Sequence, residues 1–67
     1  MKYEQLWIYL QNDGSDKIRL TFEQIKDILG FEIDHSFQTY KKEAALFGYV
    51  VGKISLKEKH VNFERLK

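Results

Sequence analysis

The sequence predicts one α+β domain over residues 1–67, with the order helix, strand, helix, helix, strand, strand. Three observations predict it. Apolar residues recur at helical spacing in three segments, which indicates three amphipathic helices. Apolar and polar residues alternate in one short internal segment and again near the C-terminus, which indicates strands. Asn, Asp and Gly residues separate several of these segments, as is typical of turns.

The first helix is predicted over residues 3–10, because four apolar side chains stand at positions i, i+3, i+4 and i+7 and form one helix face. These side chains are Tyr3, Leu6, Trp7 and Leu10. The segment 12–16 ends the helix, since its Asn, Asp and Gly residues favour turn backbone. Residues 17–22 alternate between charged or polar and apolar side chains, which predicts a short strand with one buried face.

Thr21 and Gln24 form a capping-box pattern at the start of the second helix. In this motif the threonine hydroxyl accepts a hydrogen bond from an early helix N–H, and the glutamine side chain accepts one from the threonine N–H. The helix is therefore expected to begin near Phe22. Gly30 is expected to end it, because many helices end on a left-handed residue, a conformation that glycine adopts without strain.

A third helix is predicted over residues 34–47, with Asp34 as its N-cap and Gly48 after its last turn. Its apolar face comprises Phe37, Tyr40, Ala44 and Phe47. The remaining residues are predicted to form a β-hairpin with its turn at residues 57–60. Gly52 is expected to mark a bulge or a close approach of two backbones.

These elements have the order of a winged helix-turn-helix domain, which combines three helices with a small antiparallel sheet. The first strand is expected to join the terminal hairpin in a three-stranded sheet packed against the helices. One core is predicted, formed by Tyr3, Leu6, Trp7, Leu10, Ile18, Leu20, Phe22, Ile25, Leu29, Phe37, Tyr40, Phe47, Ile54 and Phe63.

The motif L-T-F-x-x-I-x-x-I-L-G at residues 20–30, followed by V-x-F-x-R at residues 61–65, resembles a family of small prokaryotic proteins whose domain is of unknown function. Ser36, Tyr40 and Gly48 also match the spacing of that family. Family members often carry a W-W-x-N segment after the third-helix region, which this chain lacks. The matched positions are mainly core and capping residues, so the resemblance implies a kind of fold and no particular activity.

Composition narrows the functional classes. The chain has no cysteine, which excludes disulfides and thiolate metal sites, and its two histidines are too few for a closed zinc site. Motifs for a serine nucleophile, a P-loop or a dinucleotide cofactor are absent. A domain of this size also has little room for a substrate cleft. We therefore expect a protein that is not an enzyme and that has no cofactor, metal or small-molecule ligand.

The sequence also gives an expectation for location. No apolar run approaches the roughly 20 residues of a membrane-spanning helix, and the N-terminal segment lacks the pattern of a signal peptide. The chain is therefore expected to be cytoplasmic, without membrane contact. It begins at Met and ends just after an apparent strand, which is typical of a complete chain.

Charge is distributed unevenly along the chain. Residues 1–34 hold four Lys or Arg and seven Asp or Glu, a net of −3, whereas residues 35–67 hold seven Lys or Arg and three Glu, a net of +4. A basic face would attract nucleic acid. A chance distribution over a solvated surface gives the same count, and both interpretations stay open at this point.

The leading functional hypothesis is binding of double-stranded DNA by helix 34–47 and the turn 57–60. The helix face opposite the apolar residues is polar, and amide and ammonium groups are those that contact bases and phosphates. The candidate DNA contacts are His35, Gln38, Thr39, Lys41, Lys42, Lys53, Lys57, Lys59 and His60. Ordinary solvation explains the same residue types, and lysines near strand edges also prevent pairing with other chains.

The alternative hypothesis is a protein-interaction or homodimerisation domain that does not bind nucleic acid. Four apolar residues outside the predicted core faces are candidates for a partner surface: Ile8, Tyr9, Leu46 and Val51. A dimer would suit a pseudo-palindromic DNA site and would support a small core. Scattered exposed apolar residues are common, so a surface without a partner is the competing explanation.

Overall fold

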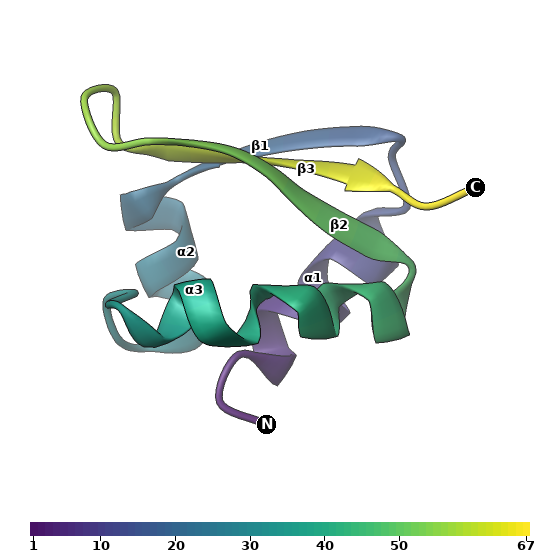
Figure 1. Cartoon of the computed structure of the whole chain (residues 1–67), viewed down its shortest axis with the longest axis horizontal. Coiled ribbons are helices and arrows are strands. Elements are labelled where there is room, and N and C mark those ends of the chain that lie inside the picture. Colours follow the sequence, from purple (N-terminus) through teal and green to yellow (C-terminus); the bar gives the residue numbers. More distant parts are fainter.

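The computed structural model describes residues 1–67, and it places three helices against one face of a three-stranded antiparallel sheet (Figure 1). The helical side comprises α1 (Glu4–Asp13), α2 (Phe22–Leu29) and α3 (Ser36–Tyr40), which continues as the 3₁₀ helix η1 (Lys41–Phe47). The sheet comprises β1 (Lys17–Thr21), β2 (Tyr49–Ser55) and β3 (His60–Arg65). The predicted α+β fold and element order are confirmed.

The sheet has the order β1-β3-β2, so the last strand of the chain lies in the middle. In β1, Ile18 lies opposite Phe63 and Leu20 lies opposite Val61. These four side chains are buried against the helices, whereas the residues that alternate with Ile18 and Leu20 in β1 are exposed. The first strand therefore joins the terminal hairpin as predicted.

Gly52 lies in a β-bulge, because the register of β2 against β3 shifts between Val51 and Ile54. A Cβ atom added at Gly52 would lie 3.4 Å from the carbonyl oxygen of Asn62. Both expectations for this glycine are thus confirmed: it lies at a bulge, and two backbones approach each other closely there.

The capping box of α2 forms as predicted. The Gln24 N–H donates to the Thr21 hydroxyl oxygen at 3.0 Å, and the Thr21 N–H donates to the Gln24 side-chain oxygen at 2.8 Å. Gly30 ends the helix with φ 84°, the left-handed conformation that its missing Cβ permits. This helix follows β1 without a connecting residue, which fixes its start relative to the sheet.

Most of the predicted core is buried. The confirmed residues are Tyr3, Leu6, Trp7, Leu10, Ile18, Leu20, Ile25, Phe37 and Phe63. Four others, Phe22, Leu29, Phe47 and Ile54, are partly buried against this cluster. Ala44, Tyr49 and Val61 complete the core, and the Tyr49 hydroxyl donates to the carbonyl oxygen of Ser15 at 2.7 Å. The prediction for Tyr40 is wrong, since its side chain is 41% exposed.

The third helix differs from the prediction in kind. Only Ser36–Tyr40 is α-helical, and Lys41–Phe47 is a 3₁₀ helix. A 3₁₀ helix has three residues per turn, so the side chains at i, i+3 and i+6 lie above one another. Lys41, Ala44 and Phe47 have this spacing, and all three are turned at least partly inward. An α-helical pattern of 3.6 residues per turn had placed Tyr40 inward instead.

No helix of the structure combines the length and the apolar composition that crossing a membrane requires.

Candidate functional site

Four polar side chains fix the start of α3 against α1. The hydroxyl oxygens of Tyr3 and Ser36 lie 2.6 Å apart, although the rest of Tyr3 is buried in the core. The Ser36 hydroxyl donates to the Asp34 carboxylate at 2.6 Å, and the Lys2 ammonium lies 3.3 Å from the same group. The exposed face of α3 is therefore held in one orientation relative to the core.

Asp34 acts as the predicted cap, although the helix begins two residues later. Its carboxylate accepts a hydrogen bond from the Ser36 N–H at 2.8 Å, while His35, directly before the helix, makes no side-chain cap. The hydrogen bonds from the Ser36 side chain and backbone lower the pKa of Asp34 to about 2. The carboxylate is thus ionised throughout the neutral range.

Four of the predicted DNA contacts on the third helical segment are exposed: His35, Gln38, Thr39 and Lys42. Lys41 is half-buried, because the 3₁₀ period aligns it with Ala44 and Phe47. Lys41 is therefore less accessible than the other four, and its contact with DNA stays a prediction.

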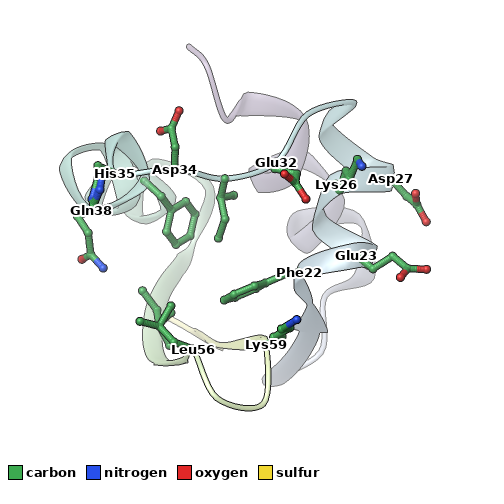
Figure 2. A pocket seen from close by; sticks show the side chains of 13 residues that line it. Phe22, Glu23, Lys26, Asp27, Glu32, Asp34, His35, Gln38, Leu56 and Lys59 are labelled. Atoms are coloured by element: carbon green, nitrogen blue, oxygen red, sulfur yellow. The ribbon is translucent and has the colours of Figure 1, made fainter.

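A groove of about 1070 Å³ separates α2 and the following loop from α3 and the tip of the hairpin (Figure 2). Its apolar lining consists of Phe22, Ile33, Phe37, Ile54 and Leu56. His35 and Gln38 from the α3 side and Lys59 from the hairpin turn also line it. The structure thus brings three of the predicted DNA contacts, from two distant segments, to one groove.

The charged lining of this groove is mainly acidic. It contains four carboxylates and two ammonium groups: Glu23, Asp27, Glu32, Asp34, Lys26 and Lys59. In Figure 2, Glu23 and Asp27 lie on α2, across the groove from His35 and Gln38. A phosphate group would meet net repulsion near α2 and less of it near the hairpin. The α2 wall is therefore the side of the groove least suited to nucleic acid.

Charge is separated between the two layers of the fold. We define the sheet layer as residues 17–21 and 49–67, which hold seven Lys or Arg and two Glu, a net of +5. The helical layer comprises residues 1–16 and 22–48, with four Lys and eight Asp or Glu, a net of −4. Figure 1 shows these layers on opposite sides of the molecule. The basic character of the protein is thus concentrated on the sheet.

The hairpin presents three of the predicted contacts to solvent, one in β2 and two in its turn. Lys53, Lys57 and Lys59 are exposed, and the turn occupies residues 56–59. His60 is not part of that turn, because it begins β3 between Thr21 and Ser55. Its side chain is 12% exposed, with Nε2 3.7 Å from a carboxylate oxygen of Glu58. The prediction that His60 belongs to the turn is therefore wrong, and its contact with DNA stays a prediction.

Four cations of the sheet layer were missing from the predicted site: Lys17, Arg19, Arg65 and Lys67. Lys17 and Arg19 occupy exposed positions of β1, which comes from the acidic half of the sequence. Their alternation with Ile18 and Leu20 already indicated an exposed face. Only the pairing of β1 with β3 places them beside the basic hairpin.

Two of the four residues predicted for a partner surface are exposed. Tyr9 and Leu46 are exposed, and Leu46 is 76% exposed. Ile8 is half-buried, and Val51 packs against the core. The prediction of Val51 as an outward residue is wrong, because strand alternation turns Tyr49 and Val51 inward and Val50 outward.

The comparisons with known proteins give no match: no family model, no curated protein and no solved structure is similar to this chain. The resemblance of residues 20–30 and 61–65 to a prokaryotic family therefore stays a prediction. No group of three or more His, Asp or Glu side chains is placed to hold a metal ion.

Proposed function

We propose that this protein binds double-stranded DNA and is not an enzyme, with α3, η1 and the hairpin turn at the contact surface. The observation that carries the proposal is the separation of charge, with a net of +5 on the sheet layer that includes the hairpin. A positively charged surface attracts the phosphate backbone, and this attraction accounts for most non-specific binding to DNA. Access to DNA places the function in the cytoplasm, and the resemblance points to a prokaryotic cell.

The exposed side chains suggest a division of roles. Gln38 carries an amide that can pair with adenine, and Thr39 offers a hydroxyl to base edges or phosphates. Lys42, Lys57 and Lys59 carry ammonium groups that neutralise phosphates. The acidic wall of the groove disfavours a duplex lying over α2, so we expect the DNA to lie along the hairpin and the far side of α3.

A salt titration tests the proposal with a labelled duplex of random sequence. Each phosphate contact contributes a slope of about −0.9 in log K against log salt, or about 3.5-fold between 50 and 200 mM. Contacts by Lys42, Lys57 and Lys59 would therefore weaken binding about 40-fold over that range. Absence of binding by the wild-type protein at 50 mM salt refutes the proposal.

Single substitutions test the placement of the surface. Lys42→Ala and Lys59→Ala are each expected to reduce the salt slope by about 0.9. Lys26→Ala removes the same charge from the α2 wall and is the matched control. If binding persists and neither Lys42→Ala nor Lys59→Ala differs from Lys26→Ala, the proposed contact surface is wrong.

A second candidate function, homodimerisation, is favoured by the apolar side chains near the start of β2. Leu46, Val50 and Leu66 are exposed, and the Leu66 N–H donates to the Gly48 carbonyl oxygen at 2.8 Å. Contiguous exposed apolar surface is typical of an interface, and Leu46, at 76% exposure, is the most exposed of the three. This surface lies at the end of the hairpin opposite its turn (Figure 1), so dimerisation would leave the proposed DNA contacts accessible.

Sedimentation of the wild-type protein over a range of concentrations tests the dimer. Leu46→Glu is expected to shift a dimer to monomer, because it places a charge in the interface. Leu56→Glu makes the same change at a side chain of nearly equal exposure, 77%, in the hairpin turn, and is expected to leave the dimer intact. A wild-type protein that stays monomeric throughout excludes this function.

A further inference from the structure

The outer face of the sheet carries cations on both sides of its central strand. In β1, Lys17 lies opposite Glu64 and Arg19 lies opposite Asn62. Both cations are exposed, since β1 alternates between exposed and buried residues. Residues two apart on a strand are about 6.8 Å apart and point to the same side. Lys17 and Arg19 thus project in parallel from one edge of the sheet.

Lys53, in β2, adds a third cation on the other side of the central strand β3. The bulge in β2 places Gly52 and Lys53 against Asn62, the same residue that pairs with Arg19 on the other side. Neighbouring strands are about 4.8 Å apart, so the backbones at Arg19 and Lys53 are separated by about 10 Å. Arg19, Asn62 and Lys53 therefore form one row across the sheet.

The side chain of Asn62 orients the guanidinium group of Arg19. The Arg19 Nε–H donates to the Asn62 side-chain oxygen at 2.9 Å, which fixes the direction of the guanidinium group. The remaining N–H groups of that guanidinium carry no hydrogen bond to the protein, so they are available to an acceptor from outside. A guanidinium with free donors in a fixed plane is well suited to a phosphate group.

The rest of this face contains little that opposes an anion. Its other side chains are Thr21, Val50, Ser55, His60, Asn62 and Glu64. Glu64 is the one carboxylate among them, against the three cations. The face carries no Phe, Tyr or Trp, so it lacks the stacking platform that proteins use to bind single strands. A positively charged surface without aromatic side chains is typical of proteins that contact the phosphate backbone of a duplex.

We infer that the outer face of the sheet is a second phosphate-contact surface, on which Lys17, Arg19 and Lys53 hold the backbone of a double-stranded nucleic acid. This inference rests on the proposed function and extends it to a side of the molecule that α3 does not reach. Each strand of a duplex presents one phosphate per 3.4 Å of axis, so side chains several ångströms apart contact different phosphates. The three cations therefore make separate contacts and add to those of the hairpin turn.

The test compares the full chain with the triple variant Lys17→Ala, Arg19→Ala, Lys53→Ala by anisotropy of a labelled DNA duplex of random sequence. Loss of three phosphate contacts is expected to reduce the salt slope by about 2.7. The weakening of binding between 50 and 200 mM salt then becomes about 40-fold smaller than in the wild-type protein. All three side chains are exposed, and circular dichroism verifies that the variant stays folded.

Two controls separate a localised surface from a general effect of net charge. The triple variant Lys17→Arg, Arg19→Lys, Lys53→Arg keeps all charges and is expected to retain the wild-type slope, because phosphate contacts depend mainly on charge. Lys26→Ala removes a charge from the helical layer and is expected to change the slope less than Lys17→Ala does. Equal effects of Lys26→Ala and Lys17→Ala overturn the inference.

The remaining outcomes distinguish this inference from the proposed function. Absence of wild-type binding at 50 mM salt refutes both. A salt slope that is unchanged in the triple variant and reduced in Lys42→Ala refutes the sheet surface and leaves the proposed function intact. A single strand of equal length, or a vesicle of anionic lipid, that binds more tightly than the duplex through these three cations also overturns the inference.

Discussion

Thr21→Ala isolates the contribution of the capping box to the stability of the domain. The substitution removes the hydroxyl oxygen that accepts the Gln24 N–H at 3.0 Å. The reciprocal bond, from the Thr21 N–H to the Gln24 side chain at 2.8 Å, remains possible because it uses the backbone of residue 21. The variant therefore removes half of the motif and leaves an early N–H of α2 without its partner.

The expected loss is about 1 kcal/mol of the free energy of unfolding, the typical cost of replacing a threonine N-cap by alanine. The unfolding entropy near 60 °C is about 2.1 cal/mol/K per residue, or about 0.14 kcal/mol/K for the 67-residue chain. Dividing the expected loss of free energy by this unfolding entropy gives a fall in Tm of about 7 °C. Thermal melting followed by circular dichroism resolves a shift of this size easily.

Three further variants determine whether the cap is the cause. Thr21→Ser keeps the hydroxyl and is expected to recover most of the loss, whereas Thr39→Ala removes an exposed hydroxyl from α3 and serves as the matched control. Combination of Thr21→Ala with Gln24→Ala is expected to cost less than the sum of the two single changes, since they disrupt one motif. The reasoning fails if Thr21→Ala lowers Tm no more than Thr39→Ala, or if the two changes are fully additive.

Three other predictions concern the core, a backbone turn and pH. Phe37→Ala is expected to cost about 3–5 kcal/mol, because the ring is buried and meets the Tyr3 ring edge-on at 5.3 Å. A domain of this size has about 3–10 kcal/mol in total, so the urea midpoint should fall by about a third or more, and an unchanged midpoint contradicts the prediction. Gly48→Ala is expected to lower the stability by about 1–2 kcal/mol. The cause is backbone strain alone, since φ is 86° and an added Cβ would contact nothing within 4 Å. An unchanged midpoint of chemical denaturation contradicts this prediction. The folded pKa of Asp34, about 2, lies below its ordinary value of 3.8, so its stabilising contribution is present above about pH 4 and is lost as pH falls towards 2. Urea midpoints measured from pH 6 to pH 2 should fall less steeply in Asp34→Asn than in the wild-type protein, and parallel curves disprove the assignment to the Ser36 hydrogen bonds.

The parts of the fold that the sequence predicted correctly depend on neighbouring residues. The capping box needs only two side chains three positions apart, and the left-handed end of α2 needs only a glycine at the right place. Alternation in residues 17–21 is likewise a local pattern. Each of these signals is visible in a short stretch of sequence because its energetics are confined to that stretch.

The predictions from sequence are wrong where contacts between residues far apart in the chain determine the local structure. The apolar spacing of residues 37–47 fits an α-helix and a 3₁₀ helix almost equally well, and only packing against α1 and β2 selects the period of three. That choice turns Lys41 partly inward, and Tyr40, the last residue of α3, is 41% exposed. His60 and Val51 were misplaced for a related reason, since the end of a turn and the phase of a strand depend on the register with partner strands.

The sequence by itself determined the order of the elements, most of the core and the exposed polar face of the third helical segment, because apolar periodicity and capping act within a few residues. Tertiary structure alone decided where the charge gathers. Arg19 meets Asn62, 43 residues away, when β1 pairs with β3, and this pairing moves Lys17 and Arg19 from an acidic half of the chain to a basic layer. Sequence order cannot show such a surface, because charges combine through space and strand pairing sets which of them are neighbours.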